Sequence, residues 1–232
     1  MQKFDMTDDN RASELSGATF FVDLPTKGFP YPEGHPFHNK ETIEVKMLTM
    51  KEEEILLNSS YSEKGVVVEK LLESIILEKG FNSKEILDSD QLAILLAARV
   101  DAYGEDYDVF IECSSCGEEY EAGVDLLKIM SNVVPSPVEM TDNGTYIVEL
   151  PRSEKMLKMN IKTSEQKEFF KRIIMSVDGN GDREHISKFI DNLRIMDSRF
   201  LNQKYIDTLP SLNTTFKSVC TNCSHEQEGG LP

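Results

Sequence analysis

Two pairs of cysteines, Cys113-Ser-Ser-Cys116 and Cys220-Thr-Asn-Cys223, constrain the fold of this chain more than any other feature, because 103 residues separate them. The first residues lack the apolar stretch of a secretory signal, so we expect a reducing compartment, where structural disulfides are disfavoured. Two such pairs then indicate a tetrahedral zinc site with four thiolate ligands. The alternatives are redox-active or merely reduced thiols, and disulfides.

The spacing within each pair favours a metal. Two residues between ligands let a tight turn aim both sulfurs at one point, about 2.3 Å from the ion. Gly117 suits the left-handed backbone that closes such a turn, and Ser224 occupies the matching place after the second pair. Four sulfurs leave no coordination position open, so we expect a structural and not a catalytic Zn²⁺. His225 could replace one sulfur, but we favour an exposed histidine in a polar tail.

A metal that joins the two pairs turns the chain between them into an insertion. We therefore predict an α+β fold, in which a helical domain packs with short antiparallel β elements and a four-cysteine zinc ribbon is split by a long insertion. The predicted parts are a mobile N-terminal arm at 1–17, a strand-loop-helix domain at 18–104, the ribbon at 105–126 plus 214–228, and an inserted β-hairpin and helical subdomain at 127–213.

Hydrophobic periodicity supplies the elements of these parts. We expect strands at 18–25, 42–48, 107–112, 118–124, 144–150, 156–161 and 216–219. Helices are expected at 49–58, 66–79 and 91–101, from Ser164 through Ile174, at 183–193, and from a cap at Asp197-Ser198 to about 209. Thr49-Met-Lys-Glu52 has the form of a capping box at the start of the first helix.

Two other segments contain residue types that bind metals. The loop 25–40 holds four prolines with His35 and His38, and we interpret these histidines as packed on proline and aromatic rings and not as ligands. Asp178-Gly-Asn-Gly-Asp182 resembles the start of a calcium loop, but Arg183 and Phe189 stand where that loop needs Gly and Glu. We expect a polar loop between two helices there.

The net charge of −16 opposes binding to nucleic acid or anionic lipid. The longest apolar stretch, 92–98, is far too short to span a membrane. Around the first cysteine pair, 105–122 contains seven carboxylates and no Lys or Arg: Glu105, Asp106, Asp108, Glu112, Glu118, Glu119 and Glu121. This stretch is either a solvated acidic face or a docking surface for a basic partner.

The sequence has no dinucleotide fingerprint, P-loop, nucleophile elbow or zinc-protease motif. Its four histidines have no evident catalytic partner. We therefore expect a binding or assembly protein and not an enzyme. A thiol oxidoreductase stays as an alternative, and it requires a lowered thiol pKa and solvent access at one cysteine pair.

The run Leu24-Pro-Thr-Lys-Gly-Phe-Pro-Tyr-Pro-Glu-Gly-His-Pro36, followed by the segment 42–58, resembles the N-terminal signature of T4-type bacteriophage baseplate hub assembly proteins. The resemblance extends over residues 18–228. It includes Gly65-Val66-Val67, Ala98-Arg99, Tyr103-Gly104, both cysteine pairs and Met196-Asp197-Ser198-Arg199. It departs at the C-terminus, where related chains continue into a further apolar strand.

This resemblance implies a non-enzymatic, chaperone-like factor that builds the hub of a contractile tail in the host cytoplasm. The implied partners are baseplate hub or tail proteins, without nucleic acid or membrane, and the resemblance also carries over the zinc ligands Cys113, Cys116, Cys220 and Cys223. A permanent structural component of the virion baseplate is the first alternative. A zinc-ribbon regulator that binds nucleic acid is the second.

Overall fold

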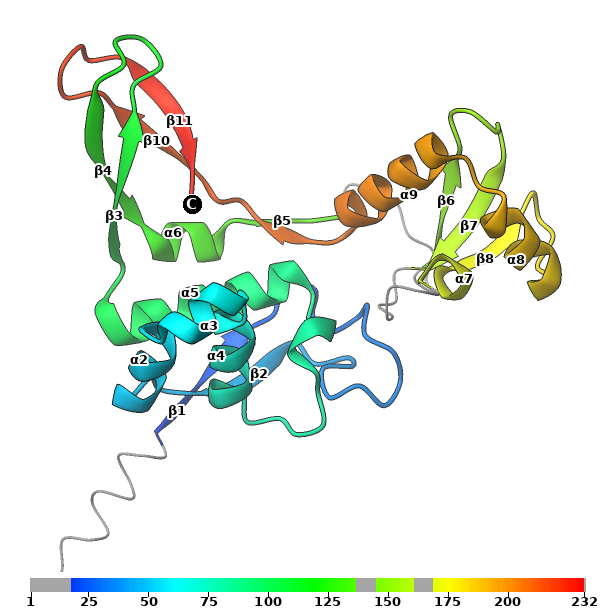
Figure 1. Cartoon of the computed structure of the whole chain (residues 1–232), viewed down its shortest axis with the longest axis horizontal. Helices are drawn as coiled ribbons and strands as arrows, with labels where there is room; N and C mark the ends of the chain where they lie inside the picture. The colour runs from blue at the N-terminus through cyan, green and yellow to red at the C-terminus, as the bar shows by residue number, and fades with distance from the viewer. Residues whose placement is uncertain (1–17, 137–144, 161–168, 232) are drawn as a thin grey trace, which may run out of the picture.

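The computed structural model in Figure 1 describes residues 18–136, 145–160 and 169–231. The predicted α+β class is confirmed, because helices alternate with short antiparallel strand pairs. Buried side chains form two separate clusters, one drawn from residues 22–129 with 212 and 220, the other from residues 146–205. Within the described ranges, no helix combines the length and apolar character needed to cross a bilayer. The predicted arm at 1–17 lies outside the described residues.

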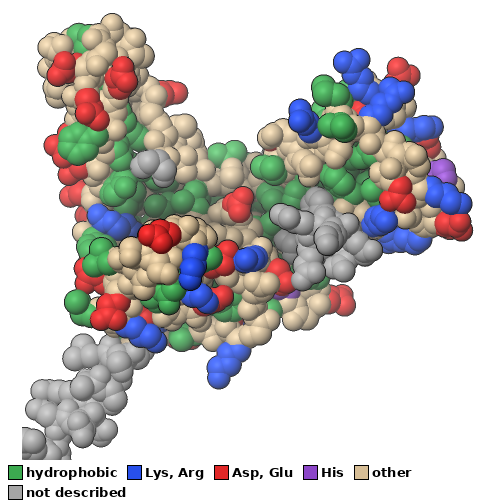
Figure 2. All heavy atoms as spheres, in the orientation of Figure 1, with side chains coloured by type: hydrophobic (Ala, Val, Ile, Leu, Met, Phe, Trp, Pro, Cys, Tyr) green, Lys and Arg blue, Asp and Glu red, His purple; other side chains and the backbone are tan. Residues whose placement is uncertain are grey.

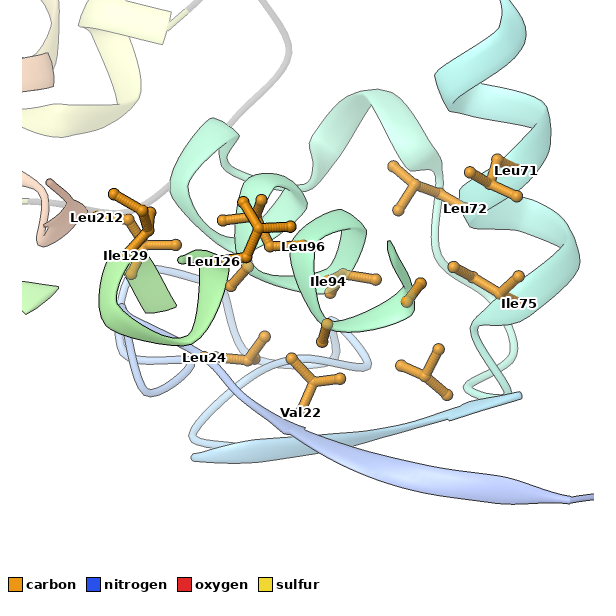
Figure 3. Close-up of a cluster of buried hydrophobic side chains, with 14 of the residues drawn as sticks. Val22, Leu24, Leu71, Leu72, Ile75, Ile94, Leu96, Leu126, Ile129 and Leu212 are labelled. Carbon is orange, nitrogen blue, oxygen red and sulfur yellow. The ribbon is translucent and has the colours of Figure 1, made fainter. Parts of the chain in front are cut away.

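The first cluster lies between a two-stranded sheet and a group of helices. Strands β1 (Thr19–Asp23) and β2 (Thr42–Lys46) pair antiparallel. They are followed by α2 (Met50–Leu56), α3 (Ser59–Lys64), α4 (Val67–Ile75), the 3-10 turn η1 (Ser83–Glu85) and α5 (Asp88–Tyr103). Figure 3 shows Val22 from β1, Ile75 from α4 and Ile94 from α5 directed into a common interior. Strand alternation and helical spacing thus place the apolar side chains as expected.

Helix ends in this region follow local hydrogen bonding. The predicted capping box at Thr49 is confirmed, since both reciprocal bonds with Glu52 form. Helix α4 ends at Ile75 and not at residue 79, because Ile76 is extended and bridges to Val45 of β2. Helix α5 begins at Asp88, so Asp90 lies inside its first turn and does not precede the helix as predicted.

The loop 25–40 is held on α5 by a buried polar network. Asp90 is fully buried and accepts hydrogen bonds from the Thr26 amide, the Thr26 hydroxyl and the Tyr31 hydroxyl. His35 stacks on Tyr31 with ring centroids 4.6 Å apart, and Nδ1 of His38 lies 2.6 Å from the Tyr31 carbonyl. The interpretation of His35 as a residue packed on an aromatic ring is therefore confirmed, whereas the packing predicted for His38 stays a prediction.

Two β-hairpins stand beside this body (Figure 1). The first joins β3 (Asp106–Glu112) to β4 (Glu119–Asp125), and the second joins β10 (Thr215–Val219) to β11 (Glu226–Gly230). His225 is exposed and the residues after it are polar, as expected, but residues 226–230 form an unpredicted strand and Leu231 packs against the first cluster. Helix α6 (Leu126–Ser131) and the short pair β5 (Val133–Val134) with β9 (Ser211–Leu212) lead into and out of the insertion.

The second cluster is covered by a sheet and three helices. The sheet has the order β6 (Thr145–Glu149), β7 (Met156–Asn160), β8 (Ile174–Val177), all antiparallel. The helices are α7 (Phe169–Ile173), α8 (Arg183–Asp191) and α9 (Ile195–Thr208). The helix predicted through Ile174 is corrected, because Ile174 begins an edge strand that pairs with Met159. The predicted start of that helix at Ser164 lies outside the described residues.

One capping prediction and one loop prediction in the insertion are also corrected. Asp197 does not cap α9 but lies buried in its first turn, where it accepts bonds from the Arg152 amide and the Ser153 hydroxyl. The calcium-like segment connects a strand to a helix and not two helices. In it, Asp178 pairs with Lys155 at 2.6 Å and Asp182 caps α8. Both carboxylates therefore have protein partners.

The boundary predicted between the ribbon and the insertion, at 126/127, falls at the first residue of α6. Ile129 of α6 and Leu212 of β9 both lie in the predicted insertion, yet both pack in the first cluster. The domain division stays a prediction, and the packing indicates that the separate part of the insertion begins after β5 and ends before β9.

Candidate metal centre

The two cysteine pairs occupy equivalent turns at the tips of the two hairpins. At the first tip, the Cys113 amide donates to the Glu118 carbonyl and the Gly117 amide donates to the Cys113 carbonyl, both at 2.9 Å. At the second tip, the Cys220 amide bonds to His225 and the Ser224 amide bonds to Cys220, again at 2.9 Å. Each strand pair thus ends in the same closed turn, which places two cysteines at the tip of the hairpin.

The residues that close these turns have the predicted backbone conformation. Gly117 has a φ of 73° and Ser224 a φ of 60°, both in the left-handed region. Glycine adopts this region freely, whereas a residue with a Cβ atom is strained there. The second turn therefore forms at a conformational cost that the first avoids.

The four sulfurs converge on one point, although the pairs are far apart in sequence. All four Sγ atoms lie within 4.8 Å of one another. The Sγ atoms of Cys113 and Cys223 are 3.6 Å apart, and those of Cys116 and Cys220 are 3.8 Å apart. A tetrahedral ion with metal–sulfur bonds of about 2.3 Å requires sulfur separations of about 3.8 Å. The four thiols therefore fit such an ion, and they are too far apart to be disulfide-bonded.

The cluster is half buried. Cys113 and Cys220 are each 1% exposed, whereas Cys116 and Cys223 are exposed to solvent. A backbone hydrogen bond from Glu118 lowers the pKa of the Cys116 thiol to about 7. At Cys223 the backbone N–H of His225 also lowers the pKa, but desolvation and the three neighbouring sulfurs outweigh it and raise the pKa to about 12. One thiolate forms readily, and further thiolates need a cation among them.

A metal cation would resolve this conflict, because it stabilises all four thiolates at once. A lowered thiol pKa together with exposure, as at Cys116, is also what a redox-active cysteine requires. Dithiol exchange needs a single pair of cysteines, whereas here four sulfurs surround one point. The arrangement therefore favours a metal site.

Side chains from one hairpin bind the other hairpin, and no sequence motif predicts these contacts. Gln227 of β11 accepts from the Ser114 amide at 2.9 Å and donates to the Glu112 carbonyl at 3.0 Å. The hydroxyls of Tyr120 and Ser218 lie 2.8 Å apart across the inner faces. Ser218 lies in β10, where a strand was expected, whereas Gln227 lies in β11, which the polar composition of the tail concealed.

His225 does not join the sulfur cluster. Its Nε2 atom lies 3.2 Å from the Ser114 hydroxyl, so the ring lies beside the opposite turn. Among the described residues, the metal-compatible cluster consists of the four cysteines alone. The preference for four sulfurs over three sulfurs and a histidine therefore agrees with the geometry.

A family model described as T4 bacteriophage base plate protein matches residues 33–231, which is most of the chain and includes both cysteine pairs. No curated protein and no solved structure matches the chain significantly.

Proposed function

Because this chain belongs to the T4 bacteriophage base plate protein family, we propose that it is a non-enzymatic assembly factor that binds a baseplate hub subunit before that subunit joins the tail. The family match over residues 33–231 is the observation that carries the proposal. The place of action is the host cell during phage assembly, and the partners are other baseplate or tail proteins.

The charge distribution supports a protein partner over nucleic acid. Residues 18–136 with 210–231 contain 11 Lys and Arg against 25 Asp and Glu, a net charge of −14. A phosphate backbone is repelled by such a surface, since binding by counterion release needs basic contacts. A basic protein surface is attracted by it.

We further propose that the four cysteines hold a structural Zn²⁺, as their spacing of 3.6 and 3.8 Å supports. A bound ion would clip the two hairpin tips together and keep the surface that they present rigid. Native mass spectrometry of the purified chain tests this step: one zinc per chain is expected. Metal-free protein whose cysteine pairs oxidise and reduce reversibly would instead favour the thiol oxidoreductase.

The assembly role is tested by affinity purification of the tagged chain from infected cells, at stages before tails are complete. We expect a hub or tail protein to copurify at a constant ratio. If only host enzymes copurify, the assembly role is wrong.

A permanent place in the baseplate is the alternative that the same family membership supports. The two roles differ in where the chain remains after assembly. Quantitative mass spectrometry of purified virions distinguishes them: a fixed copy number per particle indicates a structural component, and absence from particles that were built in its presence indicates an assembly factor.

A further inference from the structure

The hairpin β3–β4 has one face for the core and one for solvent. Val109, Tyr120, Ala122 and Val124 are buried in the first hydrophobic cluster. The alternate residues of both strands point to the opposite side, where they are exposed and no other element of the described ranges covers them. This second side is a sheet face without a partner.

An aromatic ring lies in the middle of that face. Phe110 is 69% exposed and pairs across the sheet with Glu121. Asp108 and Glu112 stand two residues to either side of it on β3, all exposed, and Glu119 stands opposite Glu112 on β4. We call the set Asp108, Phe110, Glu112, Glu119 and Glu121 the Phe110 face.

No cation of the hairpin balances these carboxylates. The sequence contains no Lys or Arg from 100 to 127. The nearest basic residues on either side have other partners among the described residues: Lys128 pairs with Asp125 at 3.1 Å, and the Arg99 guanidinium stacks on Tyr103 and Tyr107. Figure 2 shows Asp and Glu side chains gathered along this hairpin pair, while Lys and Arg side chains gather over the part of the molecule built around β6–β8.

The face therefore has two unfavourable features in the isolated chain. Like charges directly opposite each other, as in Glu112 and Glu119, destabilise a strand pair. A large ring exposed to water forgoes the stabilisation that burial would give it. A single kind of occupant relieves both, namely an apolar pocket for the ring with Lys or Arg around it.

We propose that the Phe110 face is the docking surface for a partner protein, which receives Phe110 in an apolar pocket rimmed by Lys and Arg. This inference deepens the proposed function by assigning it a surface and a partner chemistry. Charge complementarity excludes nucleic acid and anionic membranes as occupants, since both present phosphate to a face of four carboxylates. The aromatic anchor supplies most of the affinity, and the carboxylates supply specificity and speed of association.

Site-specific photo-crosslinking in infected cells tests this. A benzophenone amino acid replaces Phe110 in one variant of the full chain and Phe21 in the other. Phe21 is the matched control, because it is also 69% exposed and also lies on the outer face of a two-stranded sheet. We expect an adduct at position 110 that exceeds the one at 21 by roughly tenfold or more, with the crosslinked peptide rich in Lys and Arg.

A charge reversal provides the second measurement. Glu121→Lys should reduce the adduct at position 110 by roughly tenfold, and Glu54→Lys, an equal change of net charge at an exposed residue of α2, should leave it unchanged. If the photoreactive variant does not fold, the same comparison is made with Phe110→Ser and Phe21→Ser in the affinity purification.

The outcomes separate this inference from the proposed function. An adduct with a basic tail protein supports both, whereas an adduct with a basic protein outside the tail supports the docking surface and contradicts the assembly role. No excess of adduct at 110 over 21, an adduct with a second copy of this chain, or a crosslinked peptide without Lys and Arg overturns the docking surface.

Discussion

Two carboxylates, Glu52 and Asp90, are completely buried in the first cluster, and their environments shift their pKa values in opposite directions. At Glu52 burial alone would raise the pKa, but hydrogen bonds from Lys46, Ser74 and Thr49 outweigh it and lower the pKa to about 2. At Asp90 burial dominates over the bonds from Thr26 and Tyr31 and raises the pKa. The difference lies in the donors, because only Glu52 has a cation, Lys46 at 2.7 Å.

Glu52 should stabilise the fold at neutral pH and lose that effect in acid. A carboxyl with a lowered folded pKa contributes stability above its unfolded pKa, here 4.5, and loses it as the pH falls toward about 2. Glu52→Gln is therefore expected to lower the free energy of unfolding at pH 7 by up to about 3 kcal/mol. In urea titrations the gap between the two proteins should shrink below pH 4.5, and a gap independent of pH would refute the argument.

Asp90 should show the opposite dependence. A carboxyl whose folded pKa is raised contributes most below its unfolded pKa of 3.8 and progressively less as the pH rises above it. Relative to Asp90→Asn, the native protein should thus lose stability as the pH increases above 3.8. Asp90→Ala leaves the donors of Thr26 and Tyr31 without their acceptor, so it should cost about 3 kcal/mol below pH 3.8 and less as the pH rises. Equal slopes against pH for the native protein and Asp90→Asn would contradict the assignment.

At the scale of elements, short-range sequence motifs predict the local structure well, whereas the composition of a segment predicts its helices and strands poorly. The capping box at Thr49 and the left-handed residues Gly117 and Ser224 form as their sequences indicate, because each depends on neighbours a few residues away. Strand β8 and strand β11 escape prediction for a different reason. Ile174 continues a helical pattern but pairs with a distant strand, and Glu226–Gly230 is polar because its hairpin is exposed on alternate positions.

The candidate metal site also has features that the sequence predicts and features that it does not. The four candidate ligands could be named from the C-x-x-C spacing, since each pair is a local turn. The side chains that dock the two turns could not, because Gln227 and Ser114 meet only after the chain has returned over more than a hundred residues. Burial of polar groups such as Asp90 likewise depends on tertiary packing, and no periodicity in the sequence reports it.

Substituting the residue that closes each turn should change the free energy of unfolding in opposite directions at the two turns. Ser224 has a φ of 60° and bears the strain of a side chain in the left-handed region, so Ser224→Gly should raise the free energy of unfolding by about 0.5–1 kcal/mol. Gly117→Ser should lower it by a similar amount through the backbone alone, because an added Cβ meets its nearest atom, of Glu112, at 3.9 Å. Urea unfolding of the metal-loaded chain measures both, and changes of the same sign would contradict this account.

At the scale of the whole molecule, the chain consists of two cores with different charge, joined by thin connections. Residues 145–209 carry 12 Lys and Arg and 10 Asp and Glu, a net charge of +2, in contrast to the −14 of the remaining described body. Among the described residues, the two-residue ladder of β5 with β9 and a hydrogen bond from the Asn213 amide to the Asn132 carbonyl pair the chain entering this part with the chain leaving it. The cysteine cluster brings the two ends of the insertion together at a second place, because one cysteine pair precedes the insertion and the other follows it.

Removal of the proposed metal should therefore loosen one core and leave the other unchanged. Structural zinc contributes roughly 10–16 kcal/mol in small zinc fingers, and here the first hydrophobic cluster shares that role, so chelation or Cys113→Ser should lower the melting temperature by many degrees without complete unfolding. Hydrogen exchange should quicken in β3, β4, β10 and β11, which converge on the cysteines. The amides of β7 and α9 should keep their protection, since the second cluster includes none of the four cysteines. Faster exchange in both cores would mean that they unfold as one unit, and unchanged exchange in metal-free protein would mean that the hairpins hold without an ion.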